Sequence, residues 1–321
     1  MEQGFVLSIV IPVLNEQSTL PELLKRVGKV MDDISGGPHE LLFVDDGSSD
    51  RTVAILEEAI RGDPRIRLVS LSRNFGHQAA ISAGLDHARG DAVVIMDGDL
   101  QDAPEEIPRF LGLYREGYDV VYARRLRRKE GFLLRATYFL FYRILAALAD
   151  IQIPLDAGDF GLISRRVVEV LKATPERTRY LRGLRTWAGF RQIGIDVERS
   201  ARFAGQAKYR TGQLFKLALD GIFAFSTVPL RAASGLGAFA VLSSFGFLLY
   251  SLWAKLIAHD PPRGFTALIF VIVFLSGVQL LFLGIIGEYI GRIYQETKQR
   301  PLYVVQRVVE RLPSAADQRS G

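Results

Sequence analysis

Three carboxylates lie close together where an apolar run ends. The stretch VVIMDGDLQD, which begins at Val93, contains Asp97, Asp99 and Asp102. Carboxylates spaced i and i+2 just beyond a strand can both reach one hard divalent cation, which prefers oxygen ligands and can bridge to diphosphate oxygens. The alternative is a solvated loop in which Asp102 caps a helix predicted over residues 104–114. We favour a metal site for Asp97 and Asp99 and leave both roles open for Asp102.

A second acidic strand end, VDDGSSD, runs from Val44 to Asp50. Its carboxylates are suited to accept hydrogen bonds from a nucleobase ring NH or a ribose hydroxyl. Because Asp-Gly-Ser-Ser is also common turn chemistry, the motif alone leaves an ordinary turn open. Pro12, Asn15 and Glu16 form a third polar cluster, at the end of the first apolar run.

The elements that must position these clusters alternate between strand and helix signals over the first hundred residues. This alternation predicts an α/β fold with a parallel sheet covered by helices. The expected strands are 6–14, 40–44, 66–71 and 92–96, and the expected helices are 20–31, 52–60, 78–88 and 104–114. Thr19-x-x-Glu22 predicts a capping box for the first helix. The polar clusters then lie at the C-terminal ends of strands, where open α/β sheets bind ligands.

Composition narrows the chemistry. The chain of 321 residues is 49% hydrophobic and carries a formal charge of +5, which favours an anionic partner such as nucleic acid, a lipid surface or a phosphorylated substrate. Since it has no cysteine, disulfides, thiolate catalysis and cysteine-ligated zinc are excluded. Only four histidines are present, which disfavours a histidine-rich metal site.

Two charge-free runs, 232–254 and 265–287, are each long enough to cross a hydrocarbon core of about 30 Å. The short loop between them predicts a transmembrane hairpin with both ends on one side. Basic residues concentrate on that side, so the positive-inside rule places the N-terminal domain and both termini in the cytoplasm. The first apolar run, broken by Pro12, is interpreted as a strand and not as a signal peptide.

The segment from Arg124 to Asp150 joins a basic run to an aromatic-rich apolar stretch. Such a segment is typical of an amphipathic helix at the membrane interface, and 208–231 is a second candidate. Both could instead be core helices of a soluble domain. Nucleic-acid binding would explain the basic balance but not the two spans, so we expect the basic run to meet membrane lipid head groups.

Together the motifs resemble those of membrane-bound family 2 glycosyltransferases with a GT-A (Rossmann-like) fold. Within that family, the chain is most similar to polyprenyl-phosphate glycosyltransferases, the relatives of dolichol-phosphate mannose synthase and of undecaprenyl-phosphate glucosyltransferases. The resemblance covers nearly the whole chain, and the order of the motifs with the terminal hairpin is its specific part. The motifs are IVIPVLNE, VDDGSSDRT, RNFGHQAAISAGLDHARGD, MDGDLQDAPEEIP, DAGDFGLISRRV, RFAGQAKY, STVPLR and GEYIGRIYQETKQRPLY.

The resemblance implies roles for particular positions. Asp97, Asp99 and Gln101 match an Asp-x-Asp-x-Gln motif that binds Mg²⁺ or Mn²⁺ and through it the diphosphate of the donor, and Asp99 also counts as catalytic. Asp159 occupies the place of a catalytic base, with Asp156 close enough to compete. The positions that match donor-binding or phosphate-binding residues are Pro12, Leu14, Glu16, Val44, Asp46, Asp97, Gly98, Arg124, Arg202 and Lys208.

One departure concerns the acceptor phosphate. Many relatives have Gly-Glu-Ser-Lys-Tyr where this chain has Gly205-Gln206-Ala207-Lys208-Tyr209. The change removes a serine hydroxyl and an acidic neighbour, which puts the details of acceptor-phosphate binding in doubt.

The implied organisation has four parts. Residues 1–125 form a nucleotide-sugar and metal-binding GT-A core, 126–231 an acceptor region with juxtamembrane amphipathic helices, 232–288 two transmembrane helices, and 289–321 a cytoplasmic tail. The implied activity is inverting transfer of a hexose, with UDP-glucose as the first choice of donor and GDP-mannose or another UDP-sugar as alternatives, to polyprenyl (undecaprenyl) phosphate. The rival functions are a processive polysaccharide synthase and a non-catalytic nucleotide-binding adaptor. The resemblance also implies a homo-oligomer, since such relatives often assemble into oligomers. Small residues in the first span would allow close helix packing, either between copies or within the hairpin.

Overall fold

The computed structural model describes residues 4–125, 157–174, 176, 179–197, 228–253, 256 and 264–311. The chain divides into two compact units, each of which is described by itself. The first contains Met1–Phe139, Ile151–Lys208 and Arg300–Gly321, and the second contains Leu140–Asp150 and Tyr209–Gln299. The amphipathic helices were expected over 124–150 and 208–231. Residues 126–150 and 208–227 lie outside the described residues, whereas 124–125 end β5 and 228–231 begin α9.

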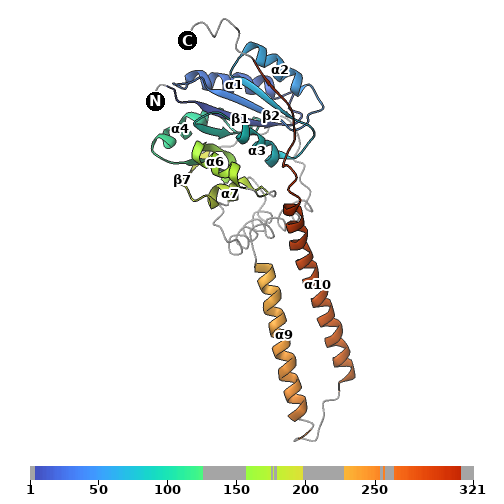
Figure 1. Ribbon diagram of the computed structural model, residues 1–321. Coiled ribbons are helices and arrows are strands. Elements are labelled where there is room, and N and C mark those ends of the chain that lie inside the picture. The colour runs from blue at the N-terminus through green and yellow to red at the C-terminus, as the bar shows by residue number, and fades with distance from the viewer. Residues whose placement is uncertain are drawn as a thin grey trace. The chain divides into compact units, whose positions relative to one another are not determined.

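The first unit is built on an eight-stranded mixed sheet (Figure 1). Its strand order is β7-β5-β6-β4-β1-β2-β3-β8. The strands are β1 (Leu7–Val13), β2 (Glu40–Asp45), β3 (Ile66–Leu71), β4 (Ala92–Ile95), β5 (Val120–Arg125), β6 (Ala157–Ser164), β7 (Gln192–Val197) and β8 (Val305–Glu310). The expected parallel pairing is confirmed for β1 to β4. Beyond these four strands, which are the ones the prediction concerned, the sheet is mixed: β6 runs antiparallel to β4 and β5, and β8 runs antiparallel to β3.

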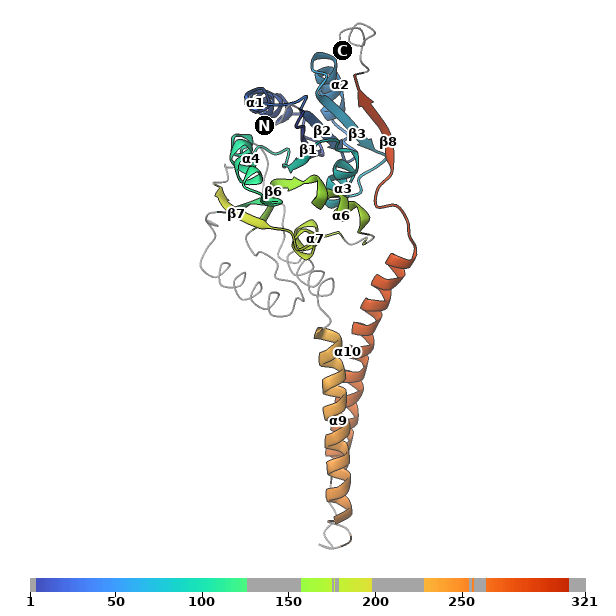
Figure 2. The same ribbon diagram turned by 60° about the vertical axis from the view of Figure 1, so that its left-hand side comes forward.

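Helices cover both faces of this sheet (Figures 1 and 2). They are α1 (Leu20–Asp33), α2 (Thr52–Gly62), α3 (His77–His87), α4 (Ile107–Arg115), α6 (Arg165–Ala173) and α7 (Leu181–Trp187), with a short 3₁₀ turn at Pro104–Glu106. Alternate residues of β1 face opposite sides: Ile9 and Ile11 pack in the cluster with α1, α2 and α4, whereas Val10 packs in the cluster with α3, α6 and α7. Because both faces are covered, every residue of β1 is buried.

Two local predictions about helix starts are not supported. Thr19 stands at the N-cap of α1, but its side chain makes no cap hydrogen bond, so the expected capping box is wrong. Its hydroxyl instead donates to the Glu16 carbonyl oxygen and, at 2.7 Å, to Glu16 Oε2. The residue before the 3₁₀ turn is Ala103, again without a side-chain cap, so Asp102 does not cap this helix start.

The C-terminal strand β8 was not predicted from the sequence. Figure 2 shows it along β3 at the edge of the sheet. Arg67 of β3 donates through Nε to Glu310 Oε2 at 2.7 Å and through Nη1 to the buried Glu40. Arg307 pairs with Glu57 of α2 at 2.5 Å. Ion pairs to β3 and to α2 therefore hold β8 at the edge of the sheet.

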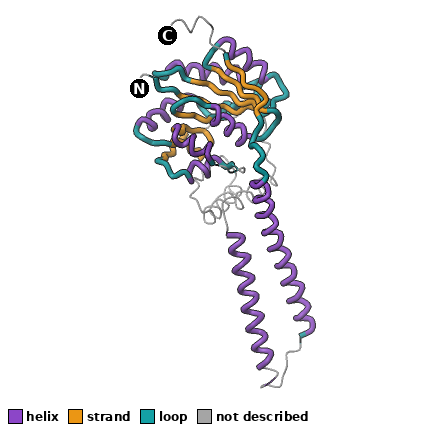
Figure 3. Tube along the Cα trace, in the orientation of Figure 1, coloured by secondary structure: helices purple, strands orange, loops and turns teal. Residues whose placement is uncertain are grey.

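The second unit contains two long apolar helices, α9 (Val228–Trp253) and α10 (Phe265–Thr297), drawn in purple in Figure 3. Their segments Leu230–Tyr250 and Val271–Thr297 are long and apolar enough to cross a membrane. Large side chains such as Phe239 and Leu280 are exposed on them, at 68% and 69%. Since water is a poor environment for so many exposed apolar groups, the helices indicate membrane association.

The packing of α3 on the sheet gives a test of this architecture. A Cβ added at Gly84 would overlap Cγ1 of Val10 and lie 3.3 Å from Cγ2 of Val44. We expect Gly84→Ala to lower the free energy of unfolding by about 1–3 kcal/mol, because stiff β-branched neighbours must shift. The measurement is thermal denaturation of the purified full-length protein.

Gly28→Ala is the matched control. Gly28 lies within α1, and a Cβ there would have no atom within 4 Å. This substitution should raise the free energy of unfolding by about 0.5–1 kcal/mol through helix propensity. Equal stability of the Gly84→Ala protein and the wild type would contradict the described contact between α3 and β1.

Candidate active site

The polar clusters meet at one edge of the sheet because of how the strands are ordered. Neighbouring strands β2, β1 and β4 are parallel, so the loops after them leave from the same edge. Strand β6 is antiparallel to β4, with Gly161 opposite Ile95. The start of β6 therefore reaches the same edge, which brings Asp159 to the turn that contains Asp97. A purely parallel sheet would not make this juxtaposition.

The turn after β4 is folded on its own carboxylates. The Asp97 backbone N–H donates to Asp102 Oδ2 at 3.2 Å, and Asp99 accepts the Gln101 backbone N–H at 3.1 Å and its side-chain Nε2 at 2.8 Å. Leu100 has a φ of 61°, a left-handed conformation that is uncommon for a side-chain-bearing residue. Asp102 therefore closes this turn through its hydrogen bond to the Asp97 N–H. The sequence had left its role open between a metal ligand and a helix cap.

Gly98 fits this turn because the end of β1 lies against it. A Cβ at Gly98 would lie 3.1 Å from Val13 Cγ1 and 3.3 Å from the Pro12 carbonyl oxygen, closer than a side chain usually tolerates. The glycine lets the acidic turn approach the first strand, so that the predicted donor positions Pro12 and Gly98 are neighbours.

The loops after β1 and β2 are joined by hydrogen bonds. Asn15, with a φ of 57°, donates its backbone N–H to Ser48 Oγ at 2.9 Å, and its Oδ1 accepts the Ser49 N–H at 2.8 Å. The Glu16 N–H donates to Thr52 Oγ1 at 2.9 Å. These bonds fix the segment that carries Pro12, Leu14 and Glu16 against the Asp-Gly-Ser-Ser turn.

The other predicted donor positions are arranged around this segment. Pro12 and Val44 are direct partners in the β1–β2 register, and the Val44 side chain is fully buried beneath α3. Leu14 is exposed at 40%. Arg124, half exposed on β5, pairs through Nε with Asp196 Oδ1 at 3.1 Å. Asp156, Arg202 and Lys208 lie outside the described residues.

Asp46 serves as an anchor for the loop before α3. Its two carboxylate oxygens accept the backbone N–H groups of Phe75 at 2.7 Å and Gly76 at 2.9 Å. Burial raises the pKa of Asp46, although both backbone donors oppose the rise. Gly76 has a φ of 100°, a conformation that glycine adopts readily, and His77 follows it as the first residue of α3. Asp46 therefore places His77. A contact of Asp46 with a nucleoside stays a prediction.

Asp159 is held as a carboxylate by its neighbours. Arg182 of α7 donates to it twice, from Nε to Oδ1 at 2.8 Å and from Nη2 to Oδ2 at 3.0 Å. Gln78 Nε2 donates to Oδ2 at 3.4 Å, and Gln78 Oε1 accepts the Leu181 backbone N–H at 3.1 Å. Burial by itself would raise the pKa of Asp159, but His77 and Arg182 outweigh it and hold that pKa well below the ordinary range.

His77 links Asp159 to the acidic turn. Its Nε2 lies 3.5 Å from Asp97 Oδ1 and 3.7 Å from Asp159 Oδ2. Burial by itself would lower the pKa of His77, but the two carboxylates raise it overall. The imidazole is therefore protonated more readily than a free histidine. It lies between two carboxylates, one in the turn after β4 and one at the start of β6.

The sequence reasoning assigned no role to His77, Gln78 or Arg182. The first two belong to the motif RNFGHQAAISAGLDHARGD, and Arg182 lies three residues before Arg185, outside every motif that carries the resemblance. A sequence signal does exist, because two polar residues open a helix directly after a glycine at a strand–helix loop. Their convergence on Asp159 depends on contacts between distant parts of the chain and could not be inferred from spacing.

The donor set around Asp97 suits a hard cation that keeps substrate or water ligands. No group of three or more histidine, aspartate or glutamate side chains is placed to hold a metal ion within the part of the chain that the structure describes. Two carboxylates with substrate oxygens are nevertheless sufficient for Mg²⁺, which is usually bound by one or two protein carboxylates. Gln101 turns its amide nitrogen toward Asp99 in this structure, so it supports that carboxylate.

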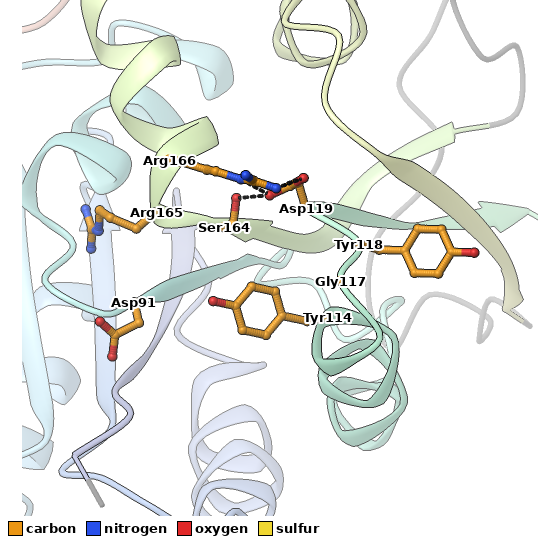
Figure 4. Close-up of a pocket in the computed structure, with 8 residues that line it drawn as sticks. All are labelled: Asp91, Tyr114, Gly117, Tyr118, Asp119, Ser164, Arg165 and Arg166. Carbon is orange, nitrogen blue, oxygen red and sulfur yellow. Dashed lines mark hydrogen bonds and ion pairs between the residues drawn. The ribbon is translucent and has the colours of Figure 1, made fainter. Parts of the chain in front are cut away.

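A cavity of about 530 Å³ lies at the opposite edge of the sheet (Figure 4). It is lined at the starts of β4 and β5 by Asp91 and Asp119 and at the end of β6 by Ser164. Figure 4 shows one of its carboxylates paired within the cavity: Asp119 accepts from Ser164 Oγ at 3.0 Å and from the guanidinium of Arg166. The cavity is thus separate from the acidic edge and adds nothing to it.

Comparison with known proteins gives consistent matches. Residues 8–172 match the family model described as glycosyl transferase family 2. The chain is 45% identical to "Uncharacterized glycosyltransferase YkcC" of Bacillus subtilis (strain 168), over 96% of this chain and 95% of that one. It is 40% identical to "Bactoprenol glucosyl transferase" of Shigella phage SfX, over 93% and 98% respectively. It is 39% identical to "Prophage bactoprenol glucosyl transferase homolog" of Escherichia coli (strain K12), over 94% and 99%.

The buried ion pair of Asp159 predicts a pH-dependent contribution to stability. Because the folded-state pKa is lowered, the pair stabilises the protein fully above the unfolded-state pKa of about 3.9 and loses this effect as the pH falls toward the folded-state value. Asp159→Asn leaves the buried guanidinium of Arg182 without its carboxylate, so it should cost on the order of 3 kcal/mol at pH 7.

The measurement is thermal denaturation of the wild type and of Asp159→Asn at pH 7 and below about pH 4. We expect the difference in stability between them to narrow only at the lower pH. The control is Asp33→Asn, an exposed aspartate at the end of α1 that should leave stability unchanged. Equal stability of wild type and Asp159→Asn at pH 7 would show that the pair does not hold the site together.

Proposed function

The chain belongs to glycosyl transferase family 2, and from this premise we propose that it transfers glucose from UDP-glucose to undecaprenyl phosphate at a membrane surface. The observation that carries the proposal is similarity over more than nine-tenths of the chain to proteins named bactoprenol glucosyl transferase. Two apolar helices long enough to span a membrane give such an enzyme access to a polyprenyl tail. GDP-mannose or another UDP-sugar is the alternative donor.

Donor binding is assigned to the edge formed by the loops after β1, β2 and β4. Pro12, Leu14 and Glu16 are placed by the hydrogen bonds of the Asn15 loop, and Asp46 is placed by its two backbone donors. Such fixed acceptors suit the ring NH and ribose hydroxyls of a nucleoside. The diphosphate then extends toward Asp97 and Asp99.

Asp97 and Asp99 would hold a divalent ion, Mg²⁺ or Mn²⁺. When bound, such an ion supplies charge stabilisation for the leaving diphosphate. The support is chemical: two carboxylates lie on one short turn, and Gln101 orients one of them through two hydrogen bonds. The metal and its identity are proposals that rest on this donor set.

The proposed reaction needs little general base catalysis from the protein. An oxygen of the acceptor phosphate attacks the anomeric carbon from the face opposite the nucleotide, so the configuration inverts. Since a phosphate monoester is largely ionised at pH 7, no strong base is needed. Asp159, with a pKa held far below its ordinary range, is a weak base and is better suited to orient its surroundings than to accept a proton. Asp156 remains the alternative base.

The rival functions differ in features that can be checked. A processive polysaccharide synthase of the Gln-x-x-Arg-Trp type would carry that motif, and this chain has only Arg-Thr-Trp at 185–187. A non-catalytic adaptor would be free to lose the acidic residues, which are kept here. Cytoplasmic placement of the first unit and of both termini, and a homo-oligomer in the membrane, are further parts of the proposal.

The test is transfer of radiolabelled sugar in detergent. We expect metal-dependent transfer from UDP-glucose to undecaprenyl phosphate, abolished by EDTA, with GDP-mannose and other UDP-sugars much poorer. Asp99→Asn should lower kcat by about 10²–10³-fold, because the charge that develops on the diphosphate loses its support. Asp33→Asn, a matched change at an exposed carboxylate, should retain wild-type activity.

Absence of transfer from every donor, with folded protein that still binds nucleotide, would reject the proposal in favour of another acceptor or the adaptor. If the Asp99→Asn protein transfers sugar as fast as the wild type, the turn after β4 has no role in the mechanism. The proposed enzyme class would still hold.

A further inference from the structure

Helix α7 carries two arginines on the side of Asp159. Arg182 and Arg185 are three residues apart, so they lie on the same face of the helix. Arg182 forms the two hydrogen bonds to Asp159 described above, and Arg185 Nη2 donates to the Gly158 carbonyl oxygen at 3.5 Å. Both guanidinium groups therefore gather at the first residues of β6, beside the acidic turn.

Arg185 is an unusual residue to find in this position. It is only 5% exposed, yet its five N–H donors make a single long hydrogen bond within the described chain, and its Nε has no partner there. Its Cζ lies 5.0 Å from the centroid of the Tyr122 ring, which supplies a weak cation–π contact. Burial lowers its pKa to about 10, so the group still carries a positive charge at neutral pH.

Among the described residues, the positive charges next to Asp159 outnumber its single negative charge. Arg182 and Arg185 contribute two positive charges, whereas Asp159 contributes one negative charge. The remaining carboxylate in reach is Asp97, which in the proposed mechanism is neutralised by a divalent ion. With the metal bound, this corner keeps an excess of positive charge, and a buried cation with unused donors is costly unless an anion joins it.

We propose that Arg182 and Arg185 form a subsite for a phosphate group of one of the two substrates. A guanidinium presents a planar fork of donors that matches phosphate oxygens, and the two residues offer such donors together: Nε of Arg185 and Nη1 of Arg182, neither of which has a hydrogen bond within the described residues. The phosphate belongs either to the polyprenyl phosphate acceptor or to the donor diphosphate.

This inference rests on the proposed function and deepens it. It explains why α7 is tied so firmly to Asp159: the carboxylate sets the plane of the Arg182 guanidinium and leaves its third nitrogen to face a ligand. Asp159 is then a positioning residue for the cation that binds phosphate. It also adds described residues to the basic positions implied by resemblance, two of which, Arg202 and Lys208, lie outside the described part of the chain.

The kinetic test uses Arg185→Gln and Arg185→Lys in the full-length enzyme with UDP-glucose and undecaprenyl phosphate. We expect Arg185→Gln to raise the KM of one substrate at least about tenfold, since a charge-assisted hydrogen bond is lost, with a smaller change in the other. A rise for undecaprenyl phosphate assigns the subsite to the acceptor, and a rise for UDP-glucose assigns it to the donor. Arg185→Lys, which keeps the charge without the fork, should restore part of the affinity.

Arg191→Gln is the matched control, because the Arg191 side chain is exposed, donates to the Glu116 carbonyl oxygen at 3.3 Å and stacks on Tyr118. Its kinetic constants should equal those of the wild type. If Arg185→Gln lowers kcat but leaves both KM values unchanged, Arg185 has a structural role and the subsite is rejected.

A binding measurement separates this inference from the proposed activity. Farnesyl phosphate and farnesol share a chain and differ in the phosphate, and UDP serves as the second probe; all are titrated by thermal shift in EDTA, without metal. Wild type and Arg191→Gln should be stabilised by farnesyl phosphate or UDP and not by farnesol, and the stabilisation should be lost in folded Arg185→Gln.

If the wild type transfers no sugar at all, the proposed function fails, but phosphate-dependent stabilisation that requires Arg185 would still support the subsite. Equal stabilisation of wild type and Arg185→Gln by each phosphate probe would overturn the inference, whatever the activity.

Discussion

The candidate site depends on one buried ion pair, between Asp159 at the start of β6 and Arg182 of α7. A carboxylate that is nine-tenths buried cannot remain ionised without a partner, and here it has a bidentate one. Two further side chains, His77 and Gln78, reach the same carboxylate from α3. Elements from three distant parts of the chain are thus held at one point, and the acidic turn after β4 is joined to them through His77.

Two loops at the ligand edge turn sharply and contain a residue in the left-handed backbone conformation. Asn15 and Leu100 both have positive φ, and each lies in a loop that follows a parallel strand. Hydrogen bonds within and between these loops compensate for the local cost, as in the Asn15 to Ser49 contact and the Asp99 to Gln101 contact. These hydrogen bonds order the loops without a ligand, and pre-ordered loops lower the entropic cost of binding one.

Local pattern was sufficient to predict β1 to β4 and the helices between them, because buried parallel strands such as LSIVIPV and amphipathic helices such as α1 have strong periodic signals. It also indicated that Asp97, Asp99 and Asp46 lie at strand ends on one edge. Local pattern could not predict the direction of β6, the addition of β8 or the partners of Asp159. Each is decided by contacts between residues far apart in sequence. The capping box failed for a related reason, because Thr19 found a better partner in Glu16 than in its own helix.

The order of the strands has a consequence for how the protein is made. Strand β8 follows α10 in the chain, whereas its partner β3 precedes both apolar helices. A ribosome therefore releases the hairpin before the residues that complete the sheet, and β3 presents an open hydrogen-bonding edge throughout that interval. The sheet of the first unit is therefore completed by a strand that is synthesised after all its other strands and after both apolar helices.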